Sequence, residues 1–362
     1  MSNSILLSPL KSKHLDLSNR IAMAPLTRCR AKDNLVGEMQ VQYYSMRADA
    51  GLIITEGAPV SSEAIGYPDI PGIYTRQQVE AWKKVTDAVH QKNGKIFVQL
   101  WHVGRISHPV FLNGQLPLAP SAIQSSTLAR TKNGKLPRPI PKAMSFEEIQ
   151  KTVKDFAQAA ENAVEAGFDG VEIHGANGYL INQFLCDGSN KRTDEYGGDI
   201  PSRCRFAMEI IRAVTETIGT SKTGIRLSPG GIGNDIYDSD PKSLFGYLIK
   251  ELDLMDLAYL HLLEPYQDLS HLPNTVQSIA KHFRSMYQGT LMINNGFQMA
   301  SAEQILQEGF ADLVSFGKLF ISNPDLVNRF RINAPLNAWD EDTFYSEGPK
   351  GYIDYPIFES NS

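Results

Sequence analysis

The sequence has only 3 cysteines, Cys29, Cys186 and Cys204, and none of them forms a CxxC pair. An odd and scattered set of this kind argues against a disulfide framework, a zinc site and an iron–sulfur cluster, and it is typical of a reducing compartment. The chain also lacks an apolar run of membrane-spanning length, and its first residues, MSNSILLSPLKSK, lack the pattern of a secretory signal. We therefore expect a cytoplasmic protein without a metal centre.

Positive charge is not in excess either, because the chain has 35 Lys and Arg and 40 Asp and Glu, which give a net charge of −5 at pH 7. This balance provides no basic field to attract nucleic acid or an anionic membrane. No G-x-G-x-x-G motif joins a predicted strand to a predicted helix, which argues against a Rossmann domain. The partners that we expect are small molecules, and the sequence leaves both a monomer and a homodimer open.

What the chain does contain is a regular alternation of short Ile- and Val-rich segments with longer segments of helical periodicity. The predicted strands are Arg20–Ala24, Leu52–Gly57, Ile96–Leu100, Gly170–His174, Gly224–Ser228, Leu257–Leu262, Thr290–Asn294 and Leu313–Phe316. The clearest predicted helices are Arg76–Lys92, Phe146–Ala166, Pro201–Ile218, Lys242–Leu252 and Ala300–Glu308. This alternation predicts an α/β protein, a (β/α)8 TIM barrel that occupies residues 1–362 as a single domain.

Three segments extend this minimal barrel. Residues 1–19 hold two short apolar pieces, which favour an N-terminal hairpin that caps the bottom of the barrel. Residues 109–143 form a long Pro- and Gly-rich loop after the third strand, on the catalytic face of such a barrel, and Asn133-Gly134 within it predicts a hairpin turn. The tail from Ala334 to Ser362 lacks helical periodicity, so we expect it to cross the barrel surface.

Polar residues stand at or near the carboxyl ends of most predicted strands, where this fold builds its active sites. They include Thr27, Glu56, Gln99, Glu172, His174, Arg226, Asn294, Asn295 and Lys318, with Gly57, Gly296 and Gly317 next to them in the chain. Each has an ordinary structural explanation; Glu172 and Arg226, for example, could form a buried ion pair. Together they favour a binding site, because an apolar core gains nothing from so many groups that need partners.

The last two strands indicate the type of ligand, because the loops that follow them commonly bind phosphate in this fold. Asn295-Gly296 and Gly317-Lys318 supply glycine for a close backbone approach and a cation, although tight turns alone also explain the glycines. Arg226 would lie across the barrel, at the far end of a phosphate-bearing cofactor. Flavin mononucleotide (FMN) fits this arrangement, because its pyrimidine side becomes anionic on reduction.

His174, Asn177 and Tyr179 follow one another at the end of the fourth predicted strand. His174 and the amide of Asn177 could donate hydrogen bonds to one substrate oxygen, and so stabilise the enolate-like charge that develops when hydride adds at the β-carbon. Tyr179 could then deliver a proton to the α-carbon. The spacing equally allows an Asn177 that makes a turn and a Tyr179 that packs in the core.

These residues closely resemble the old yellow enzyme family, the flavin-dependent ene-reductases, over nearly the whole chain. The matching motifs are APLTR at Ala24–Arg28, ITEG at Ile54–Gly57, QLWHVGRISHP at Gln99–Pro109, GVEIHGANGYLINQFL at Gly170–Leu185, NKRTDEYGG at Asn190–Gly198, IRLSP at Ile225–Pro229, ISNPDLV at Ile321–Val327 and GYIDYP at Gly351–Pro356. The resemblance implies a barrel with non-covalently bound FMN, which takes hydride from NADPH or NADH. It further implies ping-pong reduction of the C=C bond of α,β-unsaturated carbonyl or nitro compounds in the same pocket.

The matching motifs also imply roles for particular residues. FMN would be held by Pro25, Thr27, Gly57, Gln99, Arg226, Asn295, Gly296, Gly317 and Lys318. The catalytic residues would be His174 and Asn177, which bind the electron-withdrawing group of the substrate, and Tyr179, the proton donor. Tyr67, Trp101 and Tyr352 would shape the substrate pocket with their aromatic rings.

The family usually has Arg where this chain has Lys318, and a lysine lacks the bidentate fork of an arginine, which predicts weaker binding of FMN. Thr27 replaces the Cys that one branch of the family carries. Two other interpretations use some of the same residues. One is a barrel isomerase or lyase without flavin, which acts on a phosphorylated substrate with His174 as base. The other is a flavin-binding stress protein with little turnover.

Overall fold

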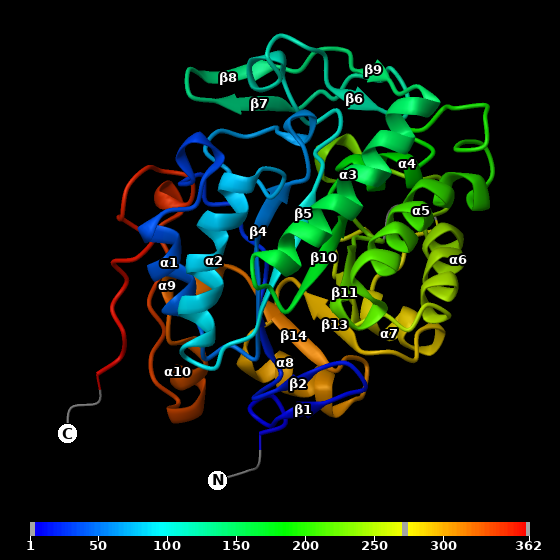
Figure 1. The fold of residues 1–362 in the computed structure, drawn as a ribbon. Coiled ribbons are helices and arrows are strands. Elements are labelled where there is room, and N and C mark those ends of the chain that lie inside the picture. Colours follow the sequence, from blue (N-terminus) through cyan, green and yellow to red (C-terminus); the bar gives the residue numbers. More distant parts are fainter. Residues whose placement is uncertain (1–3, 270–273, 360–362) are drawn as a thin grey trace.

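The computed structural model describes residues 4–269 and 274–359, and eight parallel strands within them close into a barrel. In chain order these strands are β3 (Ile21–Met23), β4 (Leu52–Pro59), β5 (Ile96–Trp101), β10 (Gly170–Gly175), β11 (Thr223–Leu227), β12 (Tyr259–Leu263), β13 (Leu291–Asn294) and β14 (Leu313–Phe316). Each strand pairs with the next one in the chain, and β14 closes the ring on β3. The predicted (β/α)8 TIM barrel is therefore confirmed, with every strand at its expected place (Figure 1).

Helices surround the barrel and bury their apolar faces against the strands (Figure 1). They are α1 (Glu38–Ser45), α2 (Arg76–His90), α3 (Phe146–Glu165), α4 (Leu180–Leu185), α5 (Ile200–Ile218), α6 (Pro241–Asp253), α7 (Ile279–Phe283), α8 (Met299–Gln307), α9 (Lys318–Ser322) and α10 (Leu326–Ile332). Local sequence signals fix several starts. At α3 the Ser145 N–H donates to a Glu148 carboxylate oxygen at 2.8 Å, and the Glu148 N–H donates back to the Ser145 hydroxyl at 3.3 Å.

The N-terminal segment forms the expected hairpin, in which β1 (Leu10–Lys11) pairs antiparallel with β2 (Asp16–Leu17). Leu10, Leu15 and Leu17 are buried in one apolar cluster with residues of the barrel strands, among them Phe97 and Tyr259. Figure 1 shows this hairpin at the end of the barrel opposite to the 109–143 loop. The hairpin therefore closes the amino-terminal end of the barrel, and leaves the other end for a site.

The 109–143 loop contains two small sheets, which lie over one end of the barrel (Figure 1). Strand β6 (Leu118–Ala119) pairs in parallel with β9 (Lys142–Ala143), and β7 (Leu128–Thr131) pairs antiparallel with β8 (Gly134–Pro137). The hairpin turn lies one residue earlier than the Asn133-Gly134 signal suggested. Thr131 pairs with Gly134, so Lys132 and Asn133 make the turn, and Gly134 supplies a positive φ of 104° at its end.

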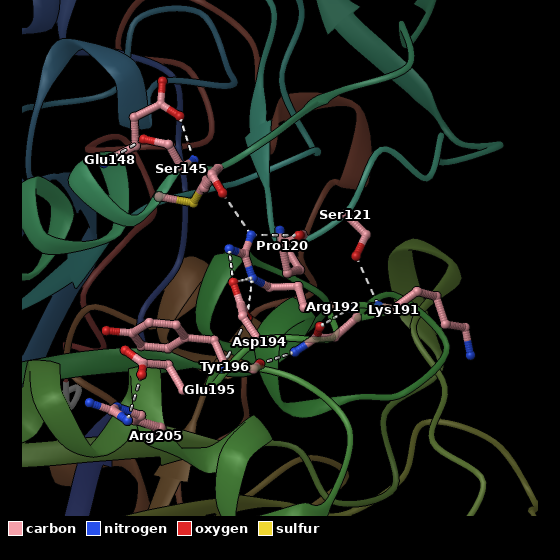
Figure 2. A network of polar contacts seen from close by, with 12 residues as sticks. Pro120, Ser121, Ser145, Glu148, Lys191, Arg192, Asp194, Glu195, Tyr196 and Arg205 are labelled. Atoms are coloured by element: carbon pink, nitrogen blue, oxygen red, sulfur yellow. Dashed lines mark hydrogen bonds and ion pairs between the residues drawn. The ribbon is translucent and has the colours of Figure 1, made fainter.

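The polar segment Cys186–Gly198 holds the base of this loop in place (Figure 2). The Arg192 guanidinium donates to the carbonyl oxygens of Pro120 at 3.1 Å and Met144 at 2.7 Å, and pairs with Asp194. The backbone N–H of Lys191 donates to the Ser121 hydroxyl at 2.8 Å. These contacts hold the residues that directly follow β6 and β9 against the segment, so the segment has a structural role.

The C-terminal tail, described up to residue 359, crosses the barrel surface as expected; it lies at the mouth of the barrel, where two buried arginines hold it. Arg28 donates to the carbonyl oxygens of Phe344 at 3.0 Å and Gly351 at 2.7 Å. Arg30 donates to several further carbonyl oxygens within residues 343–350. Because both arginines follow β3 directly, the tail is fixed against the carboxyl end of that strand.

Candidate functional site

A cavity of about 540 Å³ opens at the carboxyl ends of the barrel strands. The predicted site residues that line it are Pro25, Thr27, Asn177, Arg226, Asn295, Gly296, Gly317 and Lys318. They come from the ends of five strands, β3, β10, β11, β13 and β14, or from the residues that follow them. Residues far apart in the sequence are thus brought together at the place where this fold carries its catalytic groups.

Arg226, Asn294 and Ser315 form the floor of this cavity. The Arg226 guanidinium donates to the Asn294 side-chain oxygen at 2.7 Å, and the Asn294 amide donates to the Ser315 carbonyl oxygen at 2.8 Å. Arg226 is only 5% exposed, and its buried Nε has no hydrogen-bond partner among the described residues. A ligand with an anionic or acceptor edge would satisfy this donor.

Glu172 contacts a residue of another strand than Arg226, with which the sequence suggested an ion pair. Its carboxylate lies 2.8 Å from the Nδ1 atom of His261, and among the described residues it makes no hydrogen bond or ion pair with Arg226. The same carboxylate accepts a hydrogen bond from the Gln99 amide nitrogen at 2.8 Å.

Gln99 lies beside Gly57 in the register of β4 and β5. At Gly57 a Cβ atom would lie 2.5 Å from the Trp101 ring, so this glycine leaves room for the indole.

His174 is buried at the end of β10, and its Nδ1 atom accepts a hydrogen bond from the backbone N–H of Ala176 at 3.3 Å. Burial, together with the nearby charge of Arg226, holds the pKa of His174 well below its usual value. The imidazole is therefore neutral near pH 7, and its one proton resides on Nε2. A neutral histidine in this tautomer is a hydrogen-bond donor through Nε2 alone.

Asn177 adopts a left-handed backbone conformation, with φ of 58°, and lines the cavity. Its N–H donates to the Ser228 hydroxyl at 2.9 Å, and its carbonyl oxygen accepts from the Asn234 amide at 2.8 Å. Asparagine tolerates this conformation better than most residues. The backbone of Asn177 is thus held from both sides, while its side chain remains available to a ligand.

Tyr179, Tyr67, Trp101 and His174 form an aromatic group beside the cavity. The Tyr179 ring lies edge-on to Trp101 and to His174, with ring centres 4.9 and 5.0 Å apart. The hydroxyl groups of Tyr67 and Tyr179 share a hydrogen bond of 3.0 Å. Burial raises the pKa of Tyr179 well above its usual value, so its hydroxyl keeps the proton at physiological pH.

Tyr352 does not join this group. It is fully buried, its ring stacks on Tyr43 at 4.0 Å, and the guanidinium of Arg30 lies 4.7 Å from its ring centre. The tyrosine of the tail that lines the cavity is Tyr345. Further lining residues that the sequence did not single out are Arg28, Tyr266, Phe297, Trp339 and Phe344. The only sequence signal for the tail residues was the aromatic content of a segment expected to cross the barrel.

Lys318 contributes to the cavity at the start of α9, but its ammonium group turns toward the tail. It pairs with Glu341 at 2.7 Å and lies 5.5 Å from the ring centre of Trp339. Both partners of the ion pair are more than half exposed, so its stabilising effect is small. That Lys318 binds the phosphate of FMN stays a prediction, and in this structure its ammonium group pairs with Glu341 instead.

Within residues 4–269 and 274–359, no group of three or more His, Cys, Asp and Glu side chains is arranged to hold a metal ion. In the same part of the chain, no helix has the length and apolar character that a membrane crossing requires. All three cysteines are buried and unpaired.

Comparisons with known proteins agree with this geometry. Residues 5–337 match the model of the NADH:flavin oxidoreductase / NADH oxidase family. The chain is 44% identical to 12-oxophytodienoate reductase 1 of Oryza sativa subsp. japonica over 362 residues, which cover 98% of this chain and 93% of the relative. Among solved structures, it is similar to the old yellow enzyme homologue from Zymomonas mobilis, with a TM-score of 0.94, 41% identity and 98% and 99% coverage of the two chains. Morphinone reductase gives a TM-score of 0.94 at 42% identity, with 99% and 98% coverage.

Proposed function

The chain belongs to the NADH:flavin oxidoreductase / NADH oxidase family, the family of the old yellow enzymes, and from this premise we propose how its own residues carry out the reaction. It is an enzyme that uses NAD(P)H to reduce activated alkenes through a flavin. The proposal is that non-covalently bound FMN is the flavin and that α,β-unsaturated carbonyl and nitro compounds are the alkenes. The observation that carries it is the cavity lined by Asn177 and by Arg226, whose buried Nε has no partner among the described residues, with His174 beside Arg226 in the register of β10 and β11.

The residues of the cavity fit FMN in charge and shape. The buried cation of Arg226 suits a pyrimidine ring that becomes anionic on reduction. Asn295, Gly296, Gly317 and Lys318 would surround the phosphate, and Pro25, Thr27, Gly57 and Gln99 would contact the ring system. When bound, FMN supplies the means to accept hydride from NADPH or NADH and to pass it to the alkene.

His174 and Asn177 bind the oxygen of the substrate. The Nε2–H of the neutral imidazole and the side-chain N–H of Asn177 both donate to the carbonyl or nitro oxygen, which becomes more negative as hydride reaches the β-carbon. Two donors fixed before the reaction stabilise this charge without a reorganisation of water. The backbone contacts of Asn177 to Ser228 and Asn234 keep one of the donors in place.

Tyr179 completes the reduction, because its O–H transfers a proton to the α-carbon. Hydride at the β-carbon and a proton at the α-carbon together saturate the double bond, and the phenolate that remains is reprotonated before the next turnover. The raised pKa of Tyr179 keeps the acid in its protonated form near pH 7. Its bond to Tyr67 holds the hydroxyl in one position.

A spectroscopic experiment tests this proposal. The purified protein, after incubation with FMN, is expected to absorb blue light, to bleach with NADPH in the absence of oxygen and to regain its colour with 2-cyclohexenone. A protein that never acquires flavin absorbance would contradict the FMN proposal. A protein that bleaches but is not reoxidised by any enone, maleimide or nitroalkene would be a flavin store with little turnover.

A further inference from the structure

Four buried side chains form one hydrogen-bonded chain across the inside of the barrel. They are Gln99 on β5, Glu172 on β10, His261 on β12 and Ser315 on β14, and each is at most 2% exposed. The three contacts, from Gln99 to Glu172, from Glu172 to His261 and from His261 to Ser315, each measure 2.8 Å. Ser315 lines the cavity, so this chain reaches its floor.

The direction of every hydrogen bond in this chain follows from the charges. Burial raises the pKa of Glu172, but the hydrogen bonds from His261 and Gln99 and the positive charge of Arg226 outweigh burial and lower that pKa, so the carboxylate is ionised and only accepts. Burial lowers the pKa of His261 in spite of that carboxylate, so the imidazole is neutral. Its Nδ1–H therefore donates to Glu172, and its Nε2 accepts from the Ser315 hydroxyl. One full negative charge remains inside the barrel, on Glu172.

A carboxylate in a barrel core has a cost that an apolar side chain would avoid. Burying an ion costs several kcal/mol, and replacing a buried polar network by apolar residues is often neutral or stabilising. The partners of Glu172 reduce this cost but do not explain the presence of the charge. Its position gives an explanation, because it binds the amide of Gln99 and shares the barrel interior with Arg226.

We propose that Glu172, held by His261 and Ser315, is a positioning residue that fixes the Gln99 amide as an acceptor toward the flavin and lowers the reduction potential of that flavin. The first effect follows because the Gln99 nitrogen donates to Glu172, which leaves its carbonyl oxygen for the imide N–H of a flavin ring. The second follows because a negative charge inside the barrel opposes the anionic reduced form that Arg226 favours. The inference rests on the proposed binding of FMN.

The test is the reduction potential of bound FMN in the full-length protein, measured by anaerobic titration against a reference dye. In Glu172→Gln we expect the ratio of reduced to oxidised FMN to be about tenfold higher, under the same conditions, than in the protein that retains Glu172. For a two-electron couple this corresponds to a reduction potential that is higher by about 30 mV. Ser315→Ala removes the hydrogen bond to the Nε2 lone pair of His261, so the imidazole is more easily protonated and offsets part of the Glu172 charge. A smaller rise, of about twofold in the same ratio, is therefore expected.

Asp238→Asn is the matched control. This carboxylate is also buried, and it pairs with Arg203 of α5 outside the chain of four residues. Loss of the Asp238 carboxylate is expected to leave the reduction potential of FMN unchanged. The control therefore distinguishes the effect of the Glu172 charge from a general effect of removing a buried carboxylate. If Glu172→Gln does not fold, Ser315→Ala decides: a rise supports the inference and an unchanged potential overturns it.

The outcomes also separate this inference from the proposed function. If the protein without substitutions binds no FMN, or if NADPH does not reduce its FMN, the proposed function itself is contradicted. If that protein binds FMN and NADPH reduces it, but the reduction potential is the same in Glu172→Gln, only the role of Glu172 is contradicted. A lower potential in that variant overturns the role as well, because the sign of the charge effect would be wrong.

Discussion

On the floor of the cavity, Arg226, Asn294 and Ser315 belong to three barrel strands, are at most 6% exposed and are hydrogen-bonded to one another. On its wall, Tyr266 comes from a loop and Tyr345 from the tail, with 69% and 45% of their surfaces exposed. The strands fix the floor because each is paired on both sides, whereas loops and tails carry fewer such constraints. The two surfaces therefore differ in how many arrangements they allow.

This difference matches the two ligands that a flavin reductase must bind. The cofactor is the same molecule in every turnover, and a rigid polar floor with defined donors suits it. The alkenes vary, and aromatic side chains on loops offer flat contact surfaces with few fixed hydrogen bonds. Changes on the floor are thus expected to affect the flavin, and changes on the wall to affect the choice of substrate.

The largest expected effect concerns Tyr179, which packs against Trp101 and His174. Tyr179→Phe removes the proton donor while keeping the ring contacts with Trp101 and His174. Reoxidation of the reduced flavin by 2-cyclohexenone is expected to slow by about 10² to 10⁴-fold, with reduction by NADPH nearly unchanged. Stopped-flow spectroscopy of the two half-reactions measures both rates. Equal losses in the two would show that Tyr179 has a general structural role and is not the proton donor.

Arg226→Ala breaks the floor. It removes the cation and leaves the negative charge of Glu172 without its neighbour, so the affinity for FMN is expected to fall by at least a hundredfold. Quenching of FMN fluorescence during titration of the flavin-free protein gives the dissociation constant. Arg226→Lys keeps the charge but loses the geometry of the bond to Asn294, and an intermediate affinity is expected. Affinity within threefold of the unchanged protein would exclude a flavin contact for Arg226.

Glu56 of β4 is linked to the tail through Arg28, because it accepts a hydrogen bond from the backbone N–H of Arg28, whose side chain holds the tail. Burial raises the pKa of Glu56 to about 7. A raised pKa in the folded protein means that the carboxylate destabilises the fold as the pH rises from the unfolded value, about 4.5, through 7. Glu56→Gln, which cannot ionise, is expected to gain about 2 to 3 kcal/mol over the unchanged protein between pH 5 and pH 8.

Urea unfolding of both proteins at several pH values gives this difference, and the other titrating groups cancel because the two chains share them. A difference that does not change with pH would show that Glu56 titrates near its ordinary pKa. A loss of tail contacts in the variant can be followed separately, through the fluorescence of Trp339, which is 38% exposed.

The floor of the cavity could be predicted from the sequence better than its wall. Apolar runs located every barrel strand, and residues at strand ends, such as Arg226 and Asn177, lined the cavity because strand direction fixes where they point. The bond between Glu172 and His261 joins residues 89 positions apart. The only sequence signal for it was a histidine inside the apolar run of β12, and such a residue has no partner until the barrel closes.

The tail was less predictable for a physical reason. The tail has no regular periodicity, so its path depends on the hydrogen bonds that Arg28 and Arg30 donate to its carbonyl oxygens. No local sequence pattern predicts these contacts. These contacts bury Tyr352 against Tyr43 and bring Tyr345 to the cavity. The motif GYIDYP, at Gly351–Pro356, indicated the family correctly but lies beyond Tyr345, the tail tyrosine that lines the cavity.

The smallest expected effects distinguish these two tyrosines. Tyr345 lies on the wall, with the Arg130 guanidinium of β7 at 4.6 Å from its ring centre, so Tyr345→Ala removes a contact surface shared by the tail and the 109–143 loop. We expect the KM for bulky enones to change by about three- to tenfold, with the affinity for FMN unchanged. Tyr352→Phe is the control, because its buried hydroxyl has no hydrogen-bond partner among the described residues, and its loss is expected to leave the KM as it is. A larger change in Tyr352→Phe than in Tyr345→Ala would return Tyr352 to the substrate pocket and would mean that the tail takes another path across the barrel mouth when substrate is bound.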